Sequence, residues 1–156
     1  MRNRLNYGLI AIFFILWMFG CSPIGREAGS FVEFNSSGME KDHEYCFDGF
    51  YAYVNDSLGN EKNVYINIRY TLDFPFRYLP LRIEETSSES DSVISTFIEI
   101  PLFDSKGNPL ERNLHSLYET EFLLHKDMPI DSVYSIWIST PLEDTGGLKS
   151  LGVFIK

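Results

Sequence analysis

The side chains that most often perform catalysis or bind metals are sparse in this chain of 156 residues. Its histidines are His43, His115 and His125, and none of them belongs to a His-x-His or His-Glu-x-x-His motif. A zinc site would therefore have to be assembled from distant strands. The sequence also has no Gly-x-Ser-x-Gly elbow and no glycine-rich phosphate loop. These patterns predict no catalytic residue, no metal and no cofactor.

Acidic side chains are abundant, but none stands in a catalytic or calcium-binding pattern. Glu84 and Glu85 begin a stretch of acids and serines that is typical of solvated charge. Glycosidase chemistry needs two carboxylates about 5 to 10 Å apart in a cleft, which no sequence feature marks. Residues 104–108 weakly resemble a calcium loop but lack the later acidic ligands, so a hairpin turn is favoured. A hydrolase with scattered carboxylates is kept as a third hypothesis.

One cysteine stands where it could be modified covalently. Arg2 and Arg4 precede an uncharged, apolar run over residues 5–19, and Gly20 directly precedes Cys21. The run is short of the roughly 20 apolar residues that a membrane span needs and is typical of an export signal. A cysteine after a small residue at this place resembles a bacterial lipobox, in which the thiol receives diacylglycerol and the chain is cut before the cysteine. An uncleaved anchor and an ordinary signal peptide are the alternatives.

Lipidation would anchor the protein and isolate the second cysteine. Acyl chains contribute about 0.8 kcal/mol per buried methylene, so several chains on Cys21 would hold the protein at a membrane. Cys46 would then have no partner for an intrachain disulfide. Its neighbours Tyr45 and Phe47 predict a small packed hydrophobe rather than a nucleophile.

Removal of residues 1–20 would make the chain strongly acidic. The full sequence carries 13 basic and 22 acidic side chains, a formal net charge of −9. The signal contains Arg2 and Arg4 and no acid, which leaves 11 basic against 22 acidic side chains, or −11. Phosphate backbones repel such a surface, so nucleic acid is not an expected partner.

The full sequence is expected to divide into a signal peptide (1–20), a lipidated N-terminus and tether (21–30) and a single domain (31–156). Within the domain, apolar and polar residues alternate with a period of two, most clearly over residues 64–71. There Val64, Ile66, Ile68 and Tyr70 would face one way and Asn67, Arg69 and Thr71 the other. Further strands are expected at 50–54, 79–83, 93–100, 133–138 and 151–155. About seven strands predict an all-β fold, an antiparallel β-sandwich.

Three local features carry expectations of their own. Pro80 lacks a ladder donor, which predicts an edge strand over 79–83. The residues Ile94, Ile98 and Ile100 would share one face of their strand. Residues 111–125 combine helical and strand periodicity, which predicts a helical turn leading into a strand.

The aromatic segment 73–78 offers the best candidate for a contact site. It follows the clearest strand and reads Asp-Phe-Pro-Phe-Arg-Tyr. Its rings either cap the core, as in an ordinary loop, or form the rim of a contact site for a protein or a sugar. In the second case Asn67, Arg69, Asp73 and Phe76 are the candidate partner-binding residues.

Three stretches carry a resemblance to the gliding-motility lipoprotein family GldH. They are residues 63–69 with 73–76 and the strand through Leu79 and Leu81; residues 98–104 with Gly107 and Leu117–Tyr118; and Leu148, Gly152–Val153 and Ile155–Lys156. The resemblance covers nearly the whole chain. It implies an envelope lipoprotein that assists gliding motility and the associated secretion machinery, with no catalytic residues known in the family.

Two functional hypotheses follow. The first is a non-enzymatic accessory or assembly factor, held in the membrane by lipid on Cys21 and bound to an envelope protein complex. No acidic run follows Cys21 in residues 22–25, which favours the periplasmic face of the outer membrane. The alternative is a glycan-binding outer-membrane lipoprotein, motivated by the 13 Phe and 9 Tyr and the sandwich-like strand pattern.

Overall fold

A computed structural model describes residues 28–48, 61–87, 90–111, 113–129 and 134–156. The predicted signal, Cys21, most of the tether and the expected strand at 50–54 lie outside these residues. No helix in the described part of the chain is long and apolar enough to cross a bilayer.

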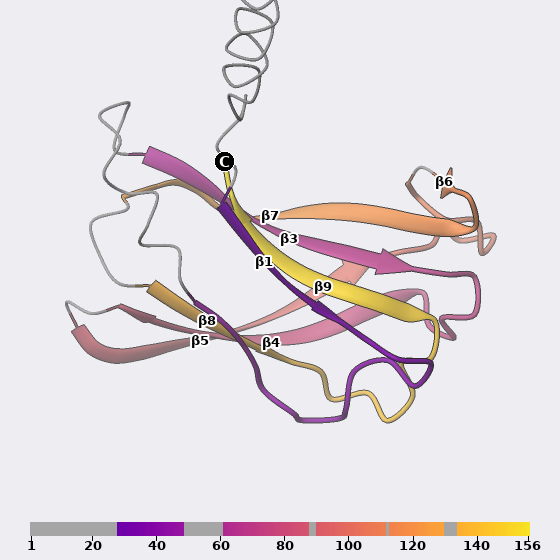
Figure 1. The fold of residues 1–156 in the computed structure, drawn as a ribbon, viewed down its shortest axis with the longest axis horizontal. Coiled ribbons are helices and arrows are strands. Elements are labelled where there is room, and N and C mark those ends of the chain that lie inside the picture. The colour runs from indigo at the N-terminus through magenta and orange to yellow at the C-terminus, as the bar shows by residue number, and fades with distance from the viewer. Residues whose placement is uncertain (1–27, 49–60, 88–89, 112, 130–133) are drawn as a thin grey trace, which may run out of the picture.

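The described residues form two antiparallel sheets that pack face to face, which confirms the predicted all-β sandwich (Figure 1). One sheet has the order β1 (Ala28–Glu33), β9 (Leu148–Ile155), β3 (Glu61–Tyr70), β7 (Leu117–Pro129) and β6 (Asn113–Leu114). The other has the order β2 (Tyr45–Phe47), β8 (Tyr134–Ser139), β4 (Tyr78–Ser87) and β5 (Ser90–Pro101). Nine strands lie within the described residues, and β1, β2 and β6 among them were not expected; β2 and β6 are too short to leave a sequence pattern. β1 starts three residues before the expected domain boundary.

The core lies between the two sheets and follows the predicted alternation. The four apolar residues of β3 that share a face are all fully buried: Val64, Ile66, Ile68 and Tyr70. From the other sheet, Leu79, Leu81 and Ile83 of β4 and Ile136 and Ile138 of β8 are fully buried too. Period-two burial on one face of each sheet is what an antiparallel sandwich requires.

The expected edge position of the strand with Pro80 is wrong, for a local reason. β4 pairs with β5 on one side and with β8 on the other. The β8 pairing begins only at Arg82, so Pro80 extends beyond the end of β8. The hydroxyl of Thr140 donates to the Pro80 carbonyl there at 2.9 Å. A proline is tolerated at this point because β8 has no residue opposite it that would need an N–H donor from Pro80.

The expected helical turn within 111–125 is also wrong. β6 and β7 form a hairpin that is joined by His115 and Ser116, both with positive φ (56° and 72°). Positive φ at both central residues is the backbone of a type I′ turn, which matches the twist of paired strands. The dipeptide His-Ser lacks the Asn-Gly signature of such turns, so this turn could not be predicted from the residue types. The turn at 104–108 is confirmed: the Asp104 carboxylate accepts from the backbone N–H groups of Lys106 and Asn108, both at 2.8 Å.

Cys46 was expected to pack as a small hydrophobe, but its side chain is exposed. β2 turns Phe47 into the core, and alternation along the strand then points Cys46 outward. Desolvation and the nearby Asp48 raise the pKa of the Cys46 thiol, which keeps it in the weakly nucleophilic protonated form.

The strand registers define two opposite ends of the sandwich. Ala28, at the start of β1, lies opposite Ile155, near the C-terminus. Tyr70, at the end of β3, lies opposite Leu148 at the start of β9 and Tyr118 near the start of β7. The C-terminus and the entry of the N-terminal segment thus share one end, and the loop after β3 lies at the other (Figure 1).

Candidate functional site

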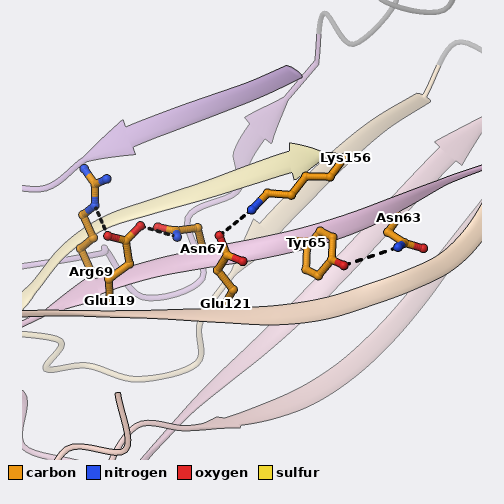
Figure 2. A network of polar contacts seen from close by, with 7 residues as sticks. All are labelled: Asn63, Tyr65, Asn67, Arg69, Glu119, Glu121 and Lys156. Atoms are coloured by element: carbon orange, nitrogen blue, oxygen red, sulfur yellow. Dashed lines mark hydrogen bonds and ion pairs between the residues drawn. The ribbon is translucent and has the colours of Figure 1, made fainter. Parts of the chain in front are cut away.

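The outward face of β3 carries a network of polar side chains (Figure 2). The Asn67 Nδ2 donates to Oε1 of Glu119 at 2.6 Å, and Arg69 Nε lies 3.5 Å from Oε2 of the same carboxylate. Glu119 belongs to β7 and stands directly opposite Arg69. One carboxylate therefore joins the two candidate residues of β3 through its two oxygens.

A second part of this network lies nearer the C-terminus on the same face. The Lys156 ammonium lies 2.9 Å from Oε1 of Glu121 and 5.4 Å from the centre of the Tyr65 ring. The Tyr65 hydroxyl accepts from the Asn63 amide at 3.4 Å. Figure 2 shows these side chains on one side of the sheet, contributed by β3, β7 and the C-terminus. Such half-exposed pairs orient side chains more than they stabilise the fold.

Aromatic rings border the network where β1 and β9 meet. Phe31 lies over Gly152 so closely that a Cβ there would come within 2.5 Å of the ring. Phe154 covers Gly29 in the same way, and the two rings pack edge to face at 4.6 Å between centroids. The Arg69 guanidinium sits 5.2 Å from the centre of the Phe31 ring. The two glycines therefore make room for an aromatic pair that adjoins the charged network.

Asn67 was expected on the exposed side of a contact site, but its side chain is only 1% exposed. It does point away from the core. Its neighbour on β9 is Gly152, which Phe31 covers, and its neighbour on β7 is Glu121. The Asn67 Oδ1 and the Ser150 Oγ are both buried without a hydrogen-bond partner among the described residues. A partner thus cannot reach the amide of Asn67 without displacing its neighbours.

The other two candidates, Asp73 and Phe76, lie in the loop between β3 and β4. Asp73 closes a tight turn, in which its Oδ2 accepts from the Thr71 hydroxyl at 3.2 Å. Phe74 is buried and caps the core, whereas Phe76 is exposed and packs edge-on against it. The loop thus combines a core-capping ring with a ring that is available for contact. Among the described residues, no hydrogen bond or ion pair joins Asp73 or Phe76 to Asn67 or Arg69.

Exposed large apolar side chains gather around this loop. We call the set Leu72, Phe76, Tyr78 and Leu110 the end patch. A backbone hydrogen bond from Leu102 N to Arg77 O, 3.0 Å long, joins the loop after β3 to the segment after β5. Within that second segment, Leu110 N donates to Leu102 O, also at 3.0 Å. Arg77 holds Tyr78 in place from the side, with its guanidinium 5.2 Å from the ring centre and its Nε donating to the Phe103 carbonyl at 3.2 Å.

Within the part of the chain that the structure describes, the titratable groups do not assemble into a recognisable catalytic centre. In the described ranges, no three histidine, cysteine or acidic side chains come together in a way that could hold a metal ion. His125 of β7 does contact Glu85 of β4, with Nε2 and Oε1 2.6 Å apart. Because these strands belong to different sheets, this contact links the two layers of the sandwich.

The sequence predicted some residues of the outward sheet face and of the end patch but not the residues that lie next to them in the structure. It identified Arg69 and Phe76 but not Glu119, which lies fifty residues from Arg69 and becomes its neighbour only through the pairing of β3 with β7. Tyr78 belonged to the aromatic segment 73–78 that was predicted as a possible contact site, whereas Leu110 was missed because it resembles an ordinary turn residue. No local signal could have revealed the aromatic pair over Gly29 and Gly152.

These features define a β-sandwich domain with a polar and aromatic sheet face and an apolar end. The family model described as GldH lipoprotein matches residues 33–150, and the chain belongs to that family. This confirms the resemblance seen in the sequence and indicates a lipid-anchored protein of the cell envelope; the family is not a known enzyme family. The matched range contains Asn67, Arg69, Asp73 and Phe76 and begins after Cys21. No curated protein matches the chain.

Proposed function

We propose that this GldH-family lipoprotein is a non-enzymatic accessory or assembly factor for gliding or secretion machinery, tethered to the periplasmic face of the outer membrane through Cys21. The observation that carries the proposal is the end patch. Leu72, Phe76 and Leu110 are exposed on two loops that a backbone hydrogen bond joins, and Tyr78 is exposed at the start of β4 directly after the first loop. Exposed apolar patches mark protein–protein contact sites.

The position of the end patch supports its role in docking. Only six residues, 22–27, separate Cys21 from the start of β1, and six residues span at most about 20 Å. The lipid would therefore keep the end containing Ala28 and Ile155 next to the membrane. The end patch lies at the opposite end of the strands, so it would face a partner in the periplasm.

Co-purification tests this proposal. The chain is tagged at its C-terminus at the native locus, the envelope is solubilised gently, and co-purifying proteins are quantified for the wild type and two variants. Phe76→Ser should reduce recovery of a defined set of envelope proteins at least several-fold. Leu123→Ser, which alters an exposed apolar residue on the outward sheet face, should leave recovery unchanged.

Two outcomes would count against the proposal. If both variants recover the envelope proteins equally well, the end patch does not contact them. Recovery of the lipoprotein alone from wild-type envelopes would remove the complex, provided that labelling with a palmitate analogue shows Cys21-dependent lipidation.

Glycan binding is the second candidate, and the outward sheet face favours it. The rings of Phe31, Tyr65 and Phe154 lie beside the carboxylates of Glu119 and Glu121 on that face. Flat rings next to planar polar groups suit sugars, which offer both C–H faces and hydroxyls. A glycan array probed with the purified chain tests this candidate: a response lost in Phe31→Ala supports it, and a flat response across the array removes it.

A further inference from the structure

β5 is one of the two edge strands of the four-stranded sheet, and it is much longer than β2 at the other edge. It spans twelve residues and pairs with β4, and no other described strand pairs with it. The pairing with β4 runs without a register shift from Tyr78 opposite Pro101 to Thr86 opposite Val93. As far as the described residues go, one side of a long, regular backbone is therefore left for solvent or for another chain.

The orientation of Pro80 shows which backbone groups face the free edge. The Thr140 hydroxyl reaches the Pro80 carbonyl from the β8 side, so the backbone polar groups of Pro80 point away from β5. Its partner Glu99 is then in a non-hydrogen-bonded pair, and the N–H and C=O of Glu99 point outward from the sheet. By alternation, Val93, Ser95 and Phe97 also present their N–H and C=O groups to the free edge.

The side chains along this edge are apolar on both faces of the sheet. Val93, Ile94 and Phe97 are 57%, 60% and 58% exposed. Natural edge strands are usually protected by lysine, proline, a bulge or short length. Residues 93–98 read Val-Ile-Ser-Thr-Phe-Ile and contain no charge, proline or bulge; the first charged side chain after them is Glu99.

We propose that β5 accepts an extended segment of a partner protein as an additional strand of this sheet. The four residues Val93, Ser95, Phe97 and Glu99 supply the backbone donors and acceptors, as in other cases of strand addition. The incoming strand carries apolar residues against Phe97 and Ile94. It carries lysine or arginine opposite Glu99, because the chain has a net charge of −9 and an uncompensated acid at this edge favours a cation.

A second copy of this chain fits the edge less well. Antiparallel pairing of two β5 strands reverses one copy, which places the two starts of β1 at opposite ends of the joined sheet. This step rests on the proposed function: with lipid on Cys21 and a short connection, both copies could not reach one membrane surface. Two copies would also bring together two chains that each carry −11 once residues 1–20 are removed, and these repel one another.

Hydrogen exchange resolved to single residues tests the geometry directly. In the purified full-length chain, the amides of Ile94, Thr96 and Ile98 face β4 and should exchange slowly. Those of Ser95 and Phe97 face the free edge and should exchange at least tenfold faster. In the co-purified complex, Ser95 and Phe97 should become as slow as their neighbours.

Proline substitutions test the same geometry in the cell. Ser95→Pro removes an N–H that faces the free edge and leaves the β4 ladder intact, so the chain should stay folded and lose the partner. Ser95→Ala keeps that N–H and should retain the partner. Thr96→Pro removes an N–H that bonds to β4, so it should lower the melting temperature far more than Ser95→Pro does.

The possible results distinguish whether a strand is added to β5 and whether that strand comes from a partner protein or from a second copy of this chain. A folded Ser95→Pro variant that retains the partner, or edge amides that stay fast in the complex, overturns strand addition. Loss of the partner in Phe76→Ser but not in Ser95→Pro leaves the proposed function standing and removes β5 from it. Edge protection by a second copy of the chain overturns the choice of occupant.

A synthetic probe separates strand addition from the proposed function. If wild-type envelopes yield no partner, a peptide of alternating valine and lysine is added to the purified chain. Slowed exchange confined to Ser95, Phe97 and their edge-facing neighbours then supports strand addition alone. Unchanged exchange overturns it.

Discussion

β3 and β5 have similar lengths and similar apolar alternation, but β3 lies inside its sheet whereas β5 lies at the edge of the other sheet. β3 lies between β9 and β7, and its inward residues are fully buried. β5 has a neighbour on one side, and Ile94 on its inward face is 60% exposed although Ile100 on the same face is buried. Alternation therefore predicts which face a residue belongs to, whereas strand order decides whether that face is covered. β3 therefore contributes mainly to the stability of the core, whereas β5 leaves apolar side chains exposed.

The largest expected effect comes from truncating matched isoleucines in the two strands. Ile66→Ala removes a fully buried side chain from β3 and should cost about 2 to 5 kcal/mol of unfolding free energy. Ile94→Ala removes an exposed one from β5 and should change stability by less than about 0.5 kcal/mol. Urea unfolding measures both losses, provided that the dependence of the unfolding free energy on urea concentration has the same slope in the variants and the wild type. Equal losses would show that β5 is covered in solution.

The end of β3 should make stability depend on alkaline pH. Burial, ahead of the charge of Glu111, raises the pKa of Tyr70 to about 12 from its ordinary value near 10. The folded state then holds this proton between about pH 10 and 12 while the unfolded state loses it, so stability falls as pH rises through that window. Relative to Tyr70→Phe, the wild type should lose about 2 to 3 kcal/mol from pH 9 to pH 12.

At neutral pH the same substitution should be mild. The Tyr70 hydroxyl donates to the Leu102 carbonyl at 2.7 Å, but that carbonyl also accepts from Leu110 N. Tyr70→Phe therefore leaves no unsatisfied acceptor and should cost about 0.5 to 1.5 kcal/mol. A pH dependence identical in the two proteins would contradict the burial of this phenol.

The aromatic pair on the outer face should show strong coupling. Gly152→Ala would bring a Cβ within 2.5 Å of the Phe31 ring and should cost about 1 to 3 kcal/mol as the ring is displaced. In a Phe31→Ala background the same change should be nearly neutral, giving a coupling energy above about 0.5 kcal/mol in a double-mutant cycle. Additive effects would mean that the ring does not lie over the glycine.

The smallest expected effect is at Asn67. Its Oδ1 has no hydrogen-bond partner in the described structure, and its one strong bond goes to Glu119, which water can solvate instead. Asn67→Val should therefore be within about 1 kcal/mol of the wild type in either direction. A loss above about 2 kcal/mol would indicate that an ordered water satisfies the amide oxygen.

The sequence predicted the parts of the fold that depend on neighbours along the chain. The buried row from Val64 to Tyr70, the turn at Asp104 and the GldH resemblance are of this kind, and all three are confirmed. The burial of Asn67 was not predictable, because it depends on a glycine 85 positions away that Phe31 covers. The position of β4 was missed for the same reason: Pro80 indicates a free N–H, but only the length of β8 shows that the free stretch is local.

The candidate site was predicted in its composition rather than in its arrangement. Arg69 and Phe76 do reach the surface, but one belongs to the sheet face and the other to the end patch. Their separation follows from the end of β3, after which the chain leaves the sheet at Thr71. Whether either of them binds a partner stays a prediction.

Site-specific photo-crosslinking in intact cells tests the central claim most directly. A benzophenone side chain replaces Phe76 in the end patch and, in a matched variant, Leu123 on the outward sheet face. A crosslinked product with one defined envelope protein at position 76, and none at position 123, is the predicted result. Crosslinks to the same protein from position 123 alone, or from neither position, would contradict a docking role for the end patch.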